Sequence, residues 1–477
     1  MSFPTNILRH MPITTYKGIM KRQIPLLILI ALASARIDAQ NTNAAYFADG
    51  YLYRHEMNPA IANEQGYISM PALGNVNVTM RSNLATDNVI YNINGKTTTF
   101  MNPDVSASSF MKGINDKNKI GADIRLDVLS LGFKGFGGYN TLGVSVRSNV
   151  GTVIPDELFK LAKEGVENKT YNIEDFKAHA DAYAEVSIGH SHAIGKKLRI
   201  GAKAKLLIGY GNIDAEFDKA QLTLGEDSWT AMTDARVQSS LKGLAYKHET
   251  SMRGPHDAHP HTYVSGADID GAGLNGYGIA FDFGATYRLT DDLSLSASLL
   301  DVGCIGWKNN MVASTNGLRT FDTDKYIFNV DEEAENCFDN ELDNLSEGLA
   351  SLYELDDIGD QGKRTVSIGA TMNIGAEYTL PSYRKLSFGI LNTTRLQGAF
   401  SWTEFRLSAN ICPTKFFSAS ASVAAGTFGT SFGWIINLHP NGLNLYCGMD
   451  HTLGKLAKQG VPLSGNGNVN VGINFPF

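Results

Sequence analysis

The chain has 477 residues, a formal net charge of −7 and a sequence pI near 5.9. This acidic balance excludes the basic surface on which nucleic-acid binding depends. Hydrophobic residues make up 43% of the chain, and no stretch after residue 40 has the roughly 20 consecutive apolar residues of a membrane-spanning helix. A helical membrane protein is therefore excluded. A transmembrane β-barrel, in which only alternate residues face lipid, remains compatible with this composition.

The first 39 residues read as an N-terminal extension followed by a secretory signal peptide. Lys21 and Arg22 precede an apolar run over residues 24–33, which has the length of a signal sequence rather than of a membrane span. Small residues then lead to a cleavage site after Ala39, with Ala35 as the alternative position. A buried N-terminal strand is the competing interpretation. Residues 46–65 fit neither strand nor helix periodicity, which predicts a packed segment ahead of the first strand.

The last ten residues alternate strictly between apolar and polar side chains. Valine, isoleucine and phenylalanine occupy the odd positions from Val469 to Phe477, whereas asparagine, glycine and proline occupy the even ones. A period of two predicts an extended strand with one apolar face. A final strand that ends on an aromatic residue resembles the insertion signal of bacterial outer-membrane barrels. Phe475 and Phe477 are therefore the candidate membrane-insertion signal, to be read by the barrel assembly machinery.

Upstream, the same alternation recurs many times. In 198–208, for example, the odd positions carry Lys203 and Lys205 while the even positions are apolar. Charge on the second face suits a hydrated lumen and not a sandwich core. The predicted strands are 67–80, 120–133, 141–150, 181–194, 198–212, 278–289, 293–303, 365–379, 386–396, 400–411, 416–427, 430–438, 443–452 and 468–477.

The connections between these strands alternate between short and long, apart from two tight links near Gly398 and Gly429. Outer-membrane barrels place short turns at the periplasmic end and long loops outside, whereas a Greek-key sandwich has no reason to alternate. The sequence thus predicts an all-β, antiparallel transmembrane outer-membrane β-barrel of about 14 strands with an N-terminal plug segment. Short helices are predicted at 156–167 and 341–355, and a loop hairpin at 219–241 would change the strand count by two.

Three groups of side chains are candidates for chemistry. His256, His259 and His261 form a histidine cluster that is a weak metal candidate, and a hydrated loop that binds nothing specific is the favoured alternative. Asp123, Arg125 and Asp127 share one strand face and favour a lumenal charge ladder with a structural role. Cys304 and Cys337 lie in one loop region, where a disulfide and unpaired apolar filler are both open.

The sequence contains no nucleophile elbow, phosphate-binding loop or dinucleotide fingerprint. We therefore expect a protein that is not an enzyme, with no cofactor and no catalytic residues. The expected partners are outer-membrane lipid, the barrel assembly machinery, a possible hydrophobic ligand and a possible surface or secretion partner. No nucleic-acid partner is expected.

The stretch from Tyr46 to Ala60, followed by residues 70–75, resembles the start of an uncharacterised outer-membrane barrel family of Bacteroidota. More distantly, the chain is similar to the FadL/OmpP1 family of hydrophobic-compound transporters, which have an Asn-Pro-Ala motif in an N-terminal plug. Asn58, Pro59 and Ala60 stand at the matching place ahead of the first strand. This resemblance implies that residues 40–65 plug the lumen of a barrel formed by 66–477. It also implies that a ligand would displace the plug and leave sideways through a kinked strand.

Two functions compete. The first is passive uptake of a hydrophobic or small solute, which predicts a lumenal path with apolar side chains at the outer mouth. The second is a non-transporting partner barrel in type IX secretion or surface attachment, which predicts a sealed lumen and long loops over 213–277 and 304–364 that carry the binding surface. An enzyme would require a converging nucleophile and base, which the sequence does not show. In all cases the expected location is the bacterial outer membrane.

Overall fold

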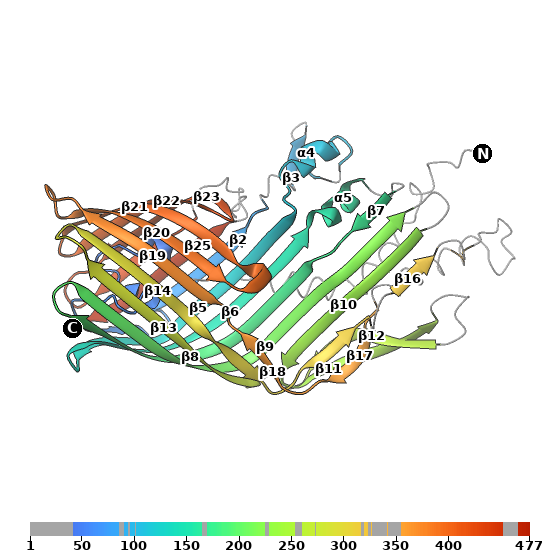
Figure 1. Ribbon diagram of the computed structural model, residues 1–477, viewed down its shortest axis with the longest axis horizontal. Helices are drawn as coiled ribbons and strands as arrows, with labels where there is room; N and C mark the ends of the chain where they lie inside the picture. Colours follow the sequence, from blue (N-terminus) through green and yellow to red (C-terminus); the bar gives the residue numbers. More distant parts are fainter. Residues whose placement is uncertain are drawn as a thin grey trace.

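A computed structural model (Figure 1) describes residues 42–84, 90–93, 96–100, 102–164, 169–224, 229–252, 260–271, 273–315, 319–322, 326, 341, 354–451 and 466–477. The predicted signal peptide, His256, His259, Cys337 and most of the predicted helix at 341–355 lie outside these residues. None of the helices among them is long and apolar enough to cross a bilayer.

Fourteen antiparallel strands close into a barrel, as the alternation in the sequence predicts. Closure is made by β2, which pairs with β5 on one side and with the final strand β25 on the other. The strands are β2 (Asn75–Ser82), β5 (Lys117–Gly135), β6 (Gly138–Pro155), β8 (Phe176–Ile194), β9 (Leu198–Leu224), β13 (Gly276–Arg288), β14 (Leu293–Trp307), β19 (Ala370–Thr379), β20 (Leu386–Leu396), β21 (Trp402–Thr414), β22 (Phe417–Gly426), β23 (Gly429–Leu438), β24 (Asn444–Met449) and β25 (Gly467–Pro476).

The outer face of the barrel is apolar and its inner face is polar. In β13, Ile279 and Phe283 are 57% and 52% exposed on the outside, whereas Asp282 between them is fully buried inside. In β25 the valines point outward and Asn468, Asn470 and Asn474 point inward. A closed sheet leaves no unpaired strand edge, and its apolar outer face needs lipid around it. The protein is therefore an outer-membrane β-barrel.

Two of the wall strands are interrupted. β1 (Tyr67–Ser69) and β2 form one wall strand broken by residues 70–74, where Leu73 is 47% exposed on the outside. β18 (Arg364–Ser367) and β19 form another, broken at Ile368 and at Gly369, which has a φ of 76°. The strands expected to be continuous over 67–80 and 365–379 are thus two strands each. The positive φ is a conformation that glycine adopts without a steric penalty.

The two ends of the barrel differ. The short turns after β5, β8, β13, β19, β21 and β23 lie at the end that also holds the C-terminus, as the alternation of connections predicts (Figure 1). At the opposite end β9 continues to Leu224, well past the predicted end at residue 212. It pairs with β13 as far as Gly209 and with β10 (Trp229–Leu241) from Gly211 onward. The predicted hairpin over 219–241 is confirmed as the tip of β9 and β10.

Several smaller helices and strands lie at this outer end. The predicted helix at 156–167 is confirmed as α5, although it ends at Glu164. Besides α5 (Asp156–Glu164), these elements are β3 (Ile90–Ile93), β4 (Lys96–Thr99), α4 (Ala107–Met111), β7 (Lys169–Asn172), β11 (Leu244–Met252), β12 (Pro260–Ile269), β15 (Met311–Ser314), β16 (Arg319–Asp322), β17 (Asp356–Asp360) and η4 (Gly398–Phe400).

Candidate functional site: the lumen and its N-terminal segment

Residues 42–66 lie inside the barrel, near the end that holds the C-terminus (Figure 1). This segment contains η2 (Asn43–Ala45) and α2 (Arg54–Met57). The backbone N–H groups of Asn43 and Ala44 each donate to the Asp450 carboxylate at 2.7 Å, and the Tyr53 hydroxyl donates to Asn474 at 2.8 Å. The lumen's asparagine and aspartate side chains thus supply the hydrogen bonds that a segment without a β-ladder needs.

The Asn-Pro-Ala triplet packs against the barrel wall at two glycines. Asn58 is fully buried, and its amide donates to the Ala285 and Ala297 carbonyls at 3.3 Å each. A Cβ at Gly284 would overlap the Asn58 side chain, and a Cβ at Gly201 would overlap the Pro59 carbonyl. Only glycine admits so close an approach of two backbones. The wall sequence is therefore fitted to this triplet.

The carboxylate of Glu56, in the segment's helix α2, binds two cations from the wall. It lies 2.7 Å from the Arg125 guanidinium on β5 and 2.7 Å from the Lys203 ammonium on β9. All three side chains are at most 6% exposed. A buried charge is tolerated only when its partners replace water, so this contact couples the segment to the wall.

Glu56 belongs to a layer of buried charges that crosses the lumen, here named the charge layer. At its centre the Asp301 carboxylate forms ion pairs with three cations, Arg147 at 2.8 Å, Lys205 at 2.6 Å and Arg395 at 3.5 Å. Asp301 sits in a bulge with a φ of 59°. Five carboxylates face five cations, so the formal charges cancel. The members are Glu56, Asp127, Glu185, Asp282, Asp301, Arg125, Arg147, Lys203, Lys205 and Arg395.

An apolar group of side chains faces the lumen on the outer side of the charge layer. We name it the outer apolar cluster, and it joins four wall strands with the residue at the break between β18 and β19. On β9, Leu207 follows Lys205 by one inward-facing position, which places the cluster immediately beyond the charges. Its members are Tyr183, Leu207, Ala280, Ile305, Trp307 and Ile368.

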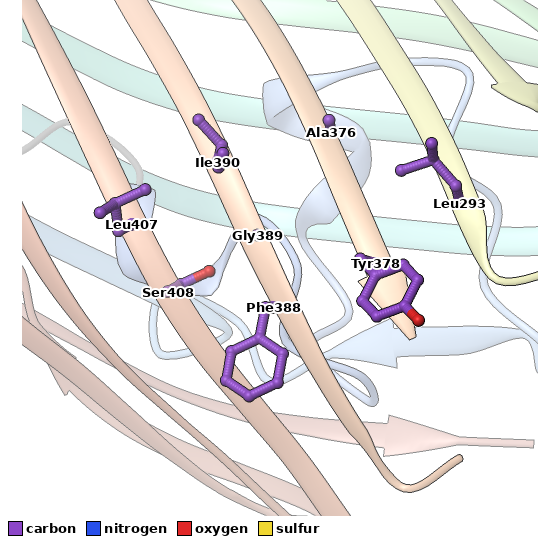
Figure 2. Close-up of a pocket in the computed structure, with 8 residues that line it drawn as sticks. All are labelled: Leu293, Ala376, Tyr378, Phe388, Gly389, Ile390, Leu407 and Ser408. Atoms are coloured by element: carbon purple, nitrogen blue, oxygen red, sulfur yellow. The ribbon is translucent and has the colours of Figure 1, made fainter. Parts of the chain in front are cut away.

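The groove drawn in Figure 2 lies on the other side of the wall. Its volume is about 350 Å³, and the large apolar side chains around it point away from the lumen. Phe388, Ile390 and Leu407 are 47%, 56% and 55% exposed. Behind it, a Cβ at Gly389 would overlap the ring of Phe47 in the lumen. The groove therefore faces lipid at a thin part of the wall and is separate from the lumenal site.

The other candidate residues lie elsewhere. His261 is at the outer end, with its Nε2 atom 3.0 Å from Asp356. No group of three side chains in the described ranges has an arrangement that could hold a metal ion. Phe475 and Phe477 are 42% and 68% exposed on the outside of the barrel at its C-terminal end, and the Phe477 N–H donates to the Gly66 carbonyl at 2.9 Å. Cys304 is in β14.

Sequence reasoning found part of the charge layer. The ladder of Asp123, Arg125 and Asp127 does face the lumen, and Arg125 binds Asp127 at 3.0 Å, which is the structural pairing favoured from the sequence. The other members that were not predicted from the sequence are Glu56, Arg147, Glu185, Asp301 and Arg395. The available signal was a charged side chain on the inward-facing register of an apolar strand, as at Glu185 in β8.

We expect deletion of Phe477 to reduce the amount of assembled barrel several-fold. This residue ends the closing strand, and the deletion removes both its exposed ring and the hydrogen bond to Gly66. The measurement is the fraction of heat-modifiable protein in outer-membrane preparations, with Phe477→Tyr as the control that keeps an aromatic ring. Wild-type levels of heat-modifiable barrel in the deletion variant would contradict the role of Phe477 in insertion.

Comparison with solved structures gives low similarity over almost the whole chain. The Pseudomonas putida toluene transporter TodX is 9% identical, with 92% of this chain and 95% of that chain covered and a TM-score of 0.38. The Ralstonia pickettii toluene transporter TbuX is 8% identical, covering 88% and 92%, with a TM-score of 0.37. A Pseudomonas aeruginosa FadL homologue is 12% identical, covering 92% and 98%, with a TM-score of 0.35.

Because each of these TM-scores is below 0.5, the barrel assignment rests on the chain's own strands and not on these structures. No curated protein matches the chain. A family model of unknown function (DUF5723) matches residues 59–450, from the Asn-Pro-Ala triplet to the end of the strand before β25. The chain belongs to this family of unknown function, DUF5723.

Proposed function

We propose that this protein is a plug-gated outer-membrane channel for the passive uptake of small, largely apolar solutes. The outer apolar cluster carries the proposal, because it puts apolar side chains on the lumenal face at the outer half of the barrel. A water-filled pore gives an apolar solute no favourable free energy of transfer, whereas burial against such side chains is favourable. Residues 42–66 act as the plug, and Asn58, Pro59 and Ala60 hold it against the wall.

The charge layer lies between the cluster and the plug, and the plug contributes one of its carboxylates. A solute that enters from outside thus meets the cluster before the charge layer. Ile368 of the cluster is at the break between β18 and β19, and the break at residues 70–74 lies beside the plug, where a Cβ at Gly74 would be 2.8 Å from the Tyr53 hydroxyl. Both breaks support a lateral route through the wall, since the regular ladder is interrupted at each of them.

The proposal is tested by uptake of the apolar dye N-phenylnaphthylamine into cells or proteoliposomes with the folded protein. We expect uptake to be several-fold faster than without the protein, and Leu207→Asn to abolish the gain. Asparagine has the same number and branching of side-chain heavy atoms as leucine but makes the cluster polar. Heat modifiability on gels shows that the variant is folded. Equal uptake with and without the protein would contradict a transport function.

A second candidate is a partner barrel in secretion or surface attachment, favoured by the wall that β9 and β10 build beyond the barrel. The two strands remain paired from Gly211 to Leu224 after β13 has left β9. Removal of the hairpin formed by β11 and β12 separates the two functions. Loss of a surface or secretion phenotype with unchanged dye uptake would support the partner barrel.

A further inference from the structure

Four residues from four neighbouring strands form one row across the wall at the level of the outer apolar cluster. Tyr183 on β8 pairs with Gly209 on β9, Gly209 pairs with Gly276 on β13, and Gly276 pairs with Trp307 on β14. The two aromatic residues therefore flank two glycines. A Cβ at Gly209 would be 2.5 Å from the indole ring, and a Cβ at Gly276 would be 2.8 Å from it. The indole ring thus packs against both glycines, in the row that leads to Tyr183.

Both rings carry a hydrogen-bond donor that has no partner among the described residues. The Tyr183 hydroxyl and the Trp307 indole N–H are each buried, with side chains 0% and 2% exposed. The Arg147 guanidinium lies 5.6 Å from the centre of the Tyr183 ring and contacts its face, which does not satisfy the hydroxyl. Buried donors without acceptors are rare and unfavourable, and two on one row point to an acceptor that arrives from outside the chain.

The surroundings restrict what can carry this acceptor. Leu207, Ile305 and Ile368 make the site apolar. The cations around it are already bound, Arg147 and Arg395 by Asp301 and Arg364 by Asp214. Because the charge layer is balanced, a negatively charged solute would bring an unpaired charge into a buried site, which is strongly unfavourable. An uncharged solute meets no such barrier.

We infer that Tyr183 and Trp307 bind an uncharged solute that has an apolar body and one hydrogen-bond acceptor, such as a ketone, ester or ether oxygen. This inference rests on the proposed transport function and names the solute class. The solute enters between the two rings as the indole lifts from the glycines. The oxygen then accepts from the indole N–H and the tyrosine hydroxyl, while the apolar body contacts the cluster.

The test compares acetophenone with ethylbenzene, which has a similar size and shape but no acceptor. Binding to the full-length folded protein in detergent is measured by isothermal titration calorimetry. We expect the wild type to bind acetophenone about tenfold tighter than ethylbenzene, since one satisfied hydrogen bond accounts for that ratio. In the double variant Trp307→Phe, Tyr183→Phe, which keeps both rings and removes both donors, the preference should disappear with ethylbenzene affinity unchanged. Trp434→Phe is the control, because Trp434 is on the outward-facing register of β23.

Other results would overturn the inference. Equal affinity of the wild type for the two solutes would contradict a site that binds an acceptor, but it would not contradict the transport of apolar solutes. A preference that persists in the double variant places the acceptor site elsewhere. Binding of benzoate as tight as that of acetophenone contradicts an uncharged solute. If neither solute binds, the inference fails, and the dye-uptake assay decides separately whether transport fails with it.

Discussion

Replacement of Glu56 by glutamine is expected to convert a closed barrel into a conducting one. Glutamine keeps the volume of the side chain but removes its charge. Arg125 retains Asp127, whereas Lys203 has Glu56 as its ion-pair partner in the described part of the chain. In this variant the Lys203 ammonium is buried without that partner, which destabilises the closed state by about 3–5 kcal/mol. Displacement of the plug would let water reach the ammonium, so the variant favours the open state. The open fraction should rise by about a hundredfold or more, since about 1.4 kcal/mol corresponds to a factor of ten.

Single-channel recording in planar bilayers measures this change. Glu64→Gln is the matched control, because Glu64 is an exposed carboxylate in the same segment. The double variant Glu56→Gln, Lys203→Gln should close the channel again, since it restores the balance of charge. Wild-type conductance in the single variant would show that Glu56 does not hold the plug. A conductance that stays high in the double variant would mean that the lost charge balance is not the cause.

The second large effect is expected for Asp301→Asn, in stability rather than in gating. The Asp301 carboxylate forms ion pairs with Arg147, Lys205 and Arg395, each within 3.5 Å. Removal of one partner from a buried ion cluster lowers the free energy of unfolding by about 3–5 kcal/mol. Asparagine has the same shape and tolerates the positive φ of this position, so the backbone is not the source of the effect. Urea unfolding of the detergent-folded barrel, followed by the loss of heat modifiability, measures the free energy.

Asp292→Asn is the control for this variant. Asp292 pairs with Arg384 at 2.8 Å in a short turn, where the arginine side chain is 61% exposed. Exposed pairs contribute about 0–1 kcal/mol, so this variant should unfold close to the wild type. Similar losses in both variants would indicate a general effect of charge removal and not a special role of the charge layer.

Much of the barrel could be predicted because a lipid-facing strand leaves a strong signal in the sequence. Each residue of β25 faces either lipid or lumen, and the alternation follows directly. The signal fails where its phase changes within a strand. The prediction for β9 ended at Asn212, although the strand continues to Leu224. Past Asn212 the apolar residues Ile213, Ala215 and Phe217 still alternate with acidic ones, but they occupy odd instead of even positions, because the register against β8 shifts at Tyr210. Such a shift reads as the end of the periodic pattern.

The breaks in the wall and the lumenal contacts could not be predicted for a different reason. The break at Ile368 and Gly369 keeps the alternation of side chains almost intact, so the pattern reads as one strand. The contact of Glu56 with Lys203 joins residues 147 positions apart, and that of Arg147 with Asp301 joins residues 154 apart. Which charged side chains meet across a lumen depends on strand order and register, and periodicity within one strand does not contain either.

The seat of the N-terminal segment also constrains the order of assembly. Its hydrogen bonds to Asp450, Asn470 and Asn474 join residues 406, 419 and 421 positions apart in sequence. Those partners come from the end of the chain, so the segment precedes the barrel in synthesis yet cannot make all of its contacts until the last strand has closed the sheet. Until then its tyrosines remain uncovered and open to proteases or chaperones. A docked segment therefore marks a barrel that has been completed, and an incomplete one stays exposed to degradation.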